Sequence, residues 1–73
     1  MIRHLTTIIE REGDGYVAWC PALDIASQGD TVEMARANVQ EAVSLFLETA
    51  PAEEVAGRLK SEVFVTDVEV AFG

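Results

Sequence analysis

The sequence is short of several residue types, and each shortage excludes a class of structure. Cys20 is the only cysteine among 73 residues, so the chain alone can form neither a disulfide nor a cysteine-based zinc site. No apolar run approaches the ~20 residues that a membrane span requires. The N-terminus also lacks the apolar core and small-residue cleavage site of a secretory leader. We therefore expect a cytoplasmic protein with no membrane association.

Basic residues are scarce as well. Five Lys and Arg stand against 13 Asp and Glu, which gives a formal net charge of −8. The acidic excess lies between residues 12 and 57, where Arg36 is the only base. Such a surface repels a phosphate backbone, so we expect no direct nucleic-acid binding. It would attract a basic protein, although a role in solubility alone explains the composition equally well.

The length allows one domain, which we expect to span residues 1–73. A domain of this size buries only about 60% of the surface that its unfolded chain exposes, so its core is thin. The hydrophobic fraction of 49% is nevertheless ample for a folded protein. Much apolar surface in a short chain suggests that some of it is buried between subunits.

Local signals predict three strands in the N-terminal part of the chain. Residues 2–12 are rich in Ile and Thr and are typical of a strand. Gly-Asp-Gly at 13–15 predicts a hairpin turn into a second strand at 16–20. Pro21 lacks the amide hydrogen that a strand ladder needs, so the second strand should end there. A short third strand is predicted at 25–28.

A helix should follow this third strand. Asp30 or Thr31 can serve as its N-cap. Apolar residues then recur at intervals of three and four from 35 to 47, which predicts an amphipathic helix. Pro51 should end this helix, and residues 52–59 are expected to form a turn or short helix.

The final segment, residues 62–72, is predicted to be a strand. One of its faces carries Phe64, Thr66, Val68, Val70 and Phe72, and the other carries Val63, Val65, Asp67, Glu69 and Ala71. The resulting order is β-β-β-α-β, an α+β fold with one main helix on one face of a mixed four-stranded sheet. The last strand would run parallel to the first, by a right-handed crossover through the helix.

One helix covers only one face of such a sheet, yet both faces carry apolar residues. Tyr16 and Trp19 fall on opposite faces of the second strand, so at least one of them should face the open side. We therefore expect a homodimer or a higher even oligomer, unless a loop or side-chain stems cover this face. Tyr16 and Trp19 are candidate interface anchors, and Asp24 and Asp30 are candidate contacts for a basic partner.

The segment from Tyr16 to Glu48 closely resembles the HicB family of antitoxins. The pattern is an aromatic strand, then Pro21-x-Leu23, a short strand, Ser-Gln-Gly-Asp-Thr at 27–31, and a helix. The helix carries family-like residues at helical spacing: Glu33, Ala35, Asn38 and Ala42. The Val-Glu-Val at 68–70 is similar to the family's closing strand.

The resemblance implies a partial RNase H-like fold and an antitoxin function. Such proteins bind HicA, a small basic toxin that cleaves messenger RNA with a histidine, and cover its catalytic and RNA-binding surface. Many members carry Gly-Cys after the Pro-x-Leu, where this chain has Asp24-Ile25. Many also continue into a C-terminal DNA-binding module, which we do not expect here because the sequence ends at Gly73.

Two other functions remain open at this stage. The first is that of an orphan homo-oligomeric module that binds another protein or a small ligand. The second, which we expect less, is a metal-dependent RNase H-like nuclease, which needs three or four converging carboxylates. Glu41 and Asp67 are the available pair, but the middle of the first strand supplies no acid, and His4 is the only histidine. We therefore expect no enzyme activity, no catalytic or metal-binding residue, and no cofactor.

Overall fold

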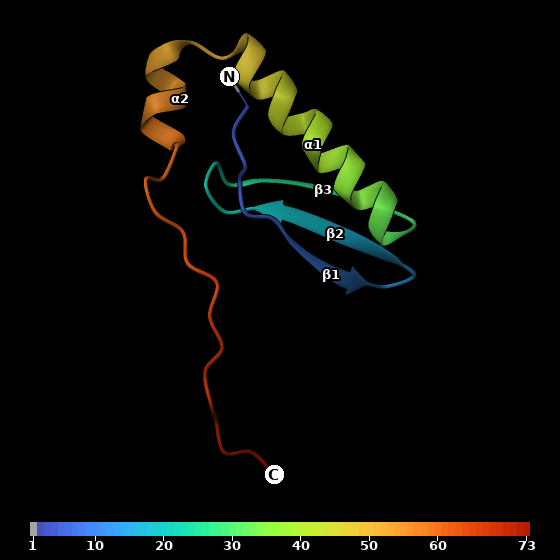
Figure 1. The fold of residues 1–73 in the computed structure, drawn as a ribbon. Coiled ribbons are helices and arrows are strands. Elements are labelled where there is room, and N and C mark those ends of the chain that lie inside the picture. Colours follow the sequence, from blue (N-terminus) through green and yellow to red (C-terminus); the bar gives the residue numbers. More distant parts are fainter. Residues whose placement is uncertain (1) are drawn as a thin grey trace.

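The computed structural model describes residues 2–73 and contains one three-stranded antiparallel sheet (Figure 1). Its strands are β1 (Ile8–Glu12), β2 (Gly15–Cys20) and β3 (Ile25–Gly29), with β2 in the centre. Gly13 has a positive φ of 59° in the β1–β2 turn, which explains the glycine there. The first strand is shorter than predicted, because residues 2–7 precede β1 without strand pairing.

The two faces of the sheet have different environments. Ala18 and Cys20 of β2 are buried beneath the helix, and Tyr16 packs against the same core. Val17 and Trp19 point to the opposite side, which we call the open face. By strand register, the open face is formed by Ile8, Glu10, Val17, Trp19, Ala26 and Gln28. The predicted alternation is thus confirmed, and Trp19 is the aromatic residue that faces outward.

Helix α1 (Val32–Thr49) covers the other face of the sheet (Figure 1). Thr31 is its N-cap, and the Thr31 hydroxyl accepts a hydrogen bond from the Met34 N–H at 3.1 Å. Thr31, and not Asp30, therefore fulfils the predicted capping role. Ala35 and Val39 are the fully buried residues of the helix, and the small Ala35 side chain allows close approach to the sheet.

Helix α2 (Ala52–Arg58) follows after Pro51, as the sequence predicts. It packs back toward the connection between β2 and β3. The Arg58 guanidinium donates to the backbone oxygen of Leu23 at 2.8 Å, and the Lys60 N–H donates to the Ala22 oxygen at 2.9 Å. These two contacts fix the end of α2 at one end of the sheet. Within residues 2–73, neither helix is long and apolar enough to cross a membrane.

The predicted fourth strand does not form, and the prediction of a mixed four-stranded sheet is wrong. Residues 62–73, the C-terminal segment, run away from the sheet without strand pairing (Figure 1). Phe64 and Val68 are each 80% exposed, and Phe72 is 97% exposed. The reason is that a strand needs a neighbour for its backbone hydrogen bonds. This segment leaves the body after Val63, which still packs against the core, and it does not pair with β1. The coarser prediction of an α+β fold is confirmed.

Candidate functional site

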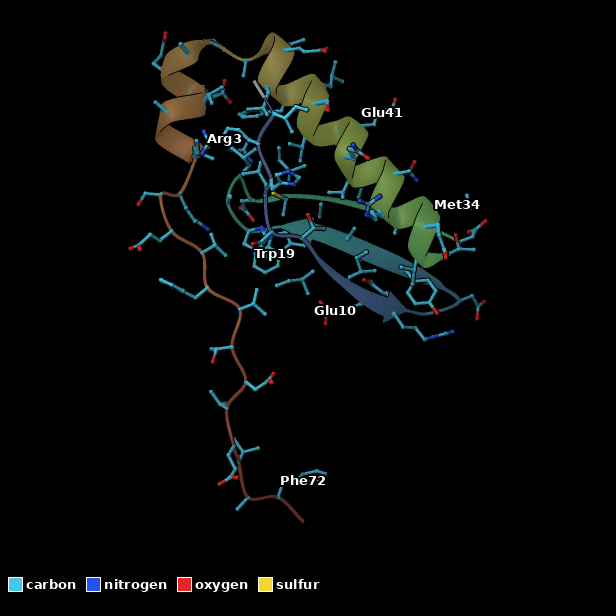
Figure 2. All side chains as sticks on the ribbon, viewed as in Figure 1. Arg3, Glu10, Trp19, Met34, Glu41 and Phe72 are labelled. Carbon is cyan, nitrogen blue, oxygen red and sulfur yellow. The ribbon has the colours of Figure 1, made fainter. Side chains whose placement is uncertain are left out.

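The first candidate site lies on the open face, where Trp19 meets the β2–β3 connection. The Trp19 indole Nε1–H donates to the Asp24 carboxylate at 3.2 Å. Trp19 is 37% exposed, and it lies on the side of the sheet away from α1 (Figure 2). The hydrogen bond holds a large aromatic surface in one orientation beside an exposed carboxylate. An apolar ring with an adjacent negative charge suits a partner that is both basic and apolar.

The backbone around Asp24 is held by its neighbours. Asp24 has a positive φ of 57°, a conformation that Asp tolerates better than most residues. The Arg58 guanidinium donates to its backbone oxygen at 3.2 Å, as well as to that of Leu23. Leu23 is fully buried and anchors the connection in the core. The Asp24 side chain is thus presented from a fixed backbone and not from a loose loop.

The second candidate site lies at the other end of β2. Tyr16 and Asp30 line one hollow of about 230 Å³, together with Glu12, Gly15, Val17, Gln28 and Gly29. The Arg11 guanidinium donates to the Tyr16 hydroxyl at 3.0 Å, and it lies 5.1 Å from the centre of the Tyr16 ring. The hollow therefore combines an aromatic side chain with two carboxylates, and Arg11 contacts that aromatic side chain.

The structure divides the four predicted partner-binding residues into two pairs. Trp19 and Asp24 form one pair, and Tyr16 and Asp30 form the other. The pairs lie at opposite ends of β2, because Tyr16 pairs with Gly29 while Cys20, next to Trp19, pairs with Ile25. A partner would have to extend along the sheet to contact both.

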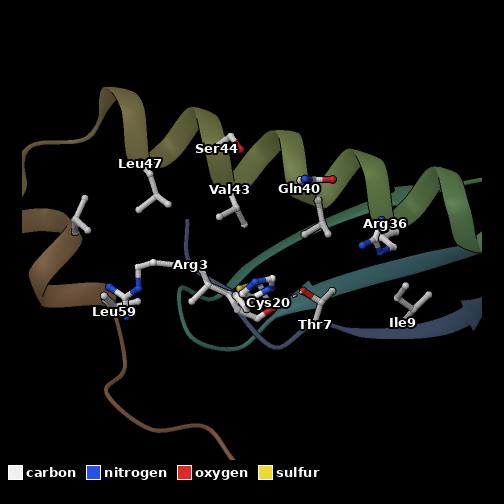
Figure 3. Close-up of a pocket in the computed structure, with 14 residues that line it drawn as sticks. Arg3, Thr7, Ile9, Cys20, Arg36, Gln40, Val43, Ser44, Leu47 and Leu59 are labelled. Carbon is white, nitrogen blue, oxygen red and sulfur yellow. Dashed lines mark hydrogen bonds between the residues drawn. The ribbon is translucent and has the colours of Figure 1, made fainter. Parts of the chain in front are cut away.

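A third feature, which the sequence reasoning missed, is a groove of about 510 Å³ below α1 (Figure 3). Val43 and Leu47 of α1 form its upper wall, and Ile9 of β1 lies at its other side. Arg3 and Arg36 line it too, although the protein as a whole is acidic. The one available signal was Arg36, the single base between residues 12 and 57.

The residues considered for catalysis are not brought together. Glu41 lies exposed on α1, while Asp67 lies in the C-terminal segment, which leaves the body (Figures 1 and 2). His4 lines the groove, and Cys20 is buried there. Among residues 2–73, no group of three or more His, Cys, Asp and Glu side chains is arranged to hold a metal ion.

Comparison with known proteins gives the family. The chain is 35% identical over 69 residues to a UPF0150 protein of Helicobacter pylori, and the match covers 93% of this chain and 96% of that protein. The chain belongs to the UPF0150 family. A UPF0150 protein of Synechocystis sp. is 46% identical over 54 residues, which covers 71% of this chain and 68% of that protein. No family model matches this UPF0150 chain. No solved structure is similar to it either.

Proposed function

We propose that this UPF0150 protein is a HicB-type antitoxin. In this proposal it binds a small, basic, HicA-like ribonuclease and covers the surface with which that enzyme holds and cleaves messenger RNA. The observation that carries the proposal is the Trp19–Asp24 pair, an oriented aromatic ring beside a carboxylate on an uncovered sheet face. The resemblance of residues 16–48 to HicB proteins supplies the identity of the partner.

Charge supports the choice of a basic, RNA-binding partner. A surface that binds RNA gathers Lys and Arg, and a protein with a net charge of −8 is attracted to it. The Tyr16–Asp30 hollow adds two further carboxylates, those of Asp30 and Glu12, at the far end of β2. Charges of this kind mainly accelerate the encounter and select the partner, whereas the aromatic contacts supply most of the affinity.

The backbone at Asp24 explains the main departure from the HicB pattern. Many HicB proteins have Gly-Cys where this chain has Asp24-Ile25. Glycine suits the positive φ of 57° found at Asp24, so the backbone can keep the same turn with either residue. Asp24 adds a carboxylate at a turn where glycine has no side chain. We infer that this carboxylate is a contact peculiar to the present chain.

A binding titration tests the proposal directly. The full chain would be mixed with a HicA-like protein encoded beside it in the source genome, and the affinity and the inhibition of RNA cleavage would be measured. The test variants are Asp24→Asn and Asp30→Asn, which remove one charge each and keep the side-chain shape. We expect each to weaken binding by about tenfold, equivalent to about 1.4 kcal/mol. The wild-type affinity should fall as salt is added.

Matched controls come from helix α2. Glu53→Gln and Glu54→Gln also remove one exposed charge each, but from a helix outside both candidate sites. Their affinities should stay within about twofold of wild type, because exposed charges outside the contact surface are screened by solvent and salt. If a stoichiometric excess of the full chain leaves RNA cleavage by the HicA-like protein unchanged, the antitoxin proposal is wrong.

A further inference from the structure

The open edge of β1 and the groove beside it form a vacant strand position. β1 pairs with β2 on one edge, and within residues 2–73 no strand pairs with its other edge. Helix α1 packs mainly against β3 and β2, and contacts β1 least. It therefore leaves space on the β1 side of the sheet, and the groove between Ile9 of β1 and Val43 and Leu47 of α1 lies there (Figure 3). A strand added next to β1 would lie in this groove.

The C-terminal segment has the properties of the missing strand. One face of the segment carries Phe64, Thr66, Val68, Val70 and Phe72, and the other carries Val65, Asp67, Glu69 and Ala71, so the first face is the more apolar of the two. The groove spans α1 from Arg36 to Leu47, about 17 Å at 1.5 Å per residue, and a strand covers that distance in about five residues. The segment is therefore more than long enough.

Charge favours the same pairing. The residues that line the groove include Arg3 and Arg36 and contain no Asp or Glu. The C-terminal segment carries Glu62, Asp67 and Glu69 and contains no Lys or Arg. The segment thus combines apolar side chains with negative charges, and the groove combines apolar side chains with positive charges, so the two are complementary.

The direction in which the C-terminal segment runs indicates that the strand next to β1 comes from a second copy of the chain. Leu59 and Val63 pack against the core, and the Lys60 N–H is bonded to Ala22, so the chain is anchored up to residue 63. From there it runs away from its own sheet (Figure 1). Returning to its own groove would need a reversal, yet residues 64–72 contain no Gly, Pro or Asn to make a turn.

We propose that two copies of this chain exchange their C-terminal segments. Residues 64–72 of one copy pair with the free edge of β1 in the other, and the face carrying Val68 and Val70 fills the groove below α1. The exchange is reciprocal and therefore closes as a symmetric dimer. It buries the exposed apolar face of the segment and satisfies two free strand edges. This inference does not depend on the antitoxin proposal.

Isotope-filtered NMR on the full chain distinguishes two arrangements. In one, the C-terminal segment pairs with β1 of the other copy; in the second, it pairs with β1 of its own chain. Equal amounts of labelled and unlabelled protein would be unfolded together and refolded, so that mixed dimers form. We expect contacts between the Val68 and Val70 methyl groups of one copy and Val43 or Leu47 of the other. Sedimentation should give twice the mass of one chain. A monomer at all concentrations, or contacts that arise within one chain only, would overturn the proposal.

A pair of neighbouring substitutions tests the assigned face. Val70→Asp places a charge in the apolar groove, whereas Ala71→Asp adds the same charge on the opposite face of the strand. We expect Val70→Asp to raise the dimer dissociation constant by about tenfold or more, and Ala71→Asp by about threefold at most. Circular dichroism should show the body folded in both. Equal effects of the two variants, or no effect of Val70→Asp, would contradict the proposed groove-facing side.

Discussion

The body of the molecule, residues 5–60, and the C-terminal segment contain similar apolar residues but bury them to very different extents. In the body, Ala18, Leu23 and Ala35 are 0% exposed. In the segment, Phe64 is 80% and Phe72 97% exposed. The difference lies in the neighbours that each region has. The strands of the body are paired and covered by α1, whereas the segment beyond Val63 meets no second layer within its own chain.

Close packing in the body depends on Leu23 and Gly29, and the C-terminal segment has no residues in comparable positions. Leu23 is the largest side chain with no exposed surface, and its backbone oxygen accepts a hydrogen bond from Arg58 at the end of α2. Gly29 lets the first turn of α1 approach β3, because a Cβ at this position would lie 2.5 Å from the Ala35 nitrogen. If the comparison is right, changes at these positions should have large effects, and changes in the segment should not.

The largest effect is expected from Leu23→Ala. It removes a fully buried side chain and leaves a cavity, so the free energy of unfolding should fall by about 2–5 kcal/mol. In a domain of this size such a loss is a large part of the total stability. Urea unfolding followed by circular dichroism would measure it. A loss below about 1 kcal/mol would mean that the β2–β3 connection is not part of the core.

Gly29→Ala should give the next largest loss. The added methyl group collides with backbone atoms of Met34 and Ala35, so α1 must move, at a cost of about 1–3 kcal/mol. Gly57→Ala is the matched control. The same methyl group at Gly57 meets no atom within 4 Å, and alanine is the better helix former in α2. Thermal unfolding should therefore rank Gly57→Ala at or above wild type and Gly29→Ala well below it.

The same contrast explains which features the sequence could predict. The turn at Gly13, the cap at 30–31 and the break at Pro51 depend on neighbouring residues, and the structure contains all three. The fourth strand depends on a distant partner for its hydrogen bonds. The pattern of residues 62–72 shows that they are suited to a sheet, but it does not specify which sheet edge they meet.

The candidate site was predictable to a similar degree. Alternation placed Tyr16 and Trp19 on opposite faces, but which face α1 covers depends on packing. The Trp19–Asp24 hydrogen bond depends on the positive φ at Asp24, which no nearby glycine signalled. The groove could not be predicted from neighbouring residues in the sequence. It lies between α1, β1 and residues 3–5, and its shape depends on how these are placed relative to one another.

Thr31→Ala should have a moderate effect. It removes the hydroxyl that accepts from the Met34 N–H, which leaves one helix donor without its cap, at a cost of about 1 kcal/mol. Asp30→Ala is the neighbouring control and should cost less than about 0.5 kcal/mol, because Asp30 is exposed and is not the N-cap. Chemical denaturation of both variants gives the comparison. Equal losses would show that the two residues share the capping role.

The smallest effect is expected from Val68→Ala, measured in solutions dilute enough for the chain to be monomeric. Val68 is 80% exposed, so its truncation should change the free energy of unfolding by no more than about 0.5 kcal/mol. The identical substitution at Val39, which is 3% exposed under the helix, should cost about 2 kcal/mol. The two variants therefore compare one chemical change in the two regions. If the effect of Val68→Ala grows with protein concentration while that of Val39→Ala does not, the segment gains its neighbours from another copy. A concentration-independent loss at Val68 as large as that at Val39 would instead place the segment within the core of its own chain.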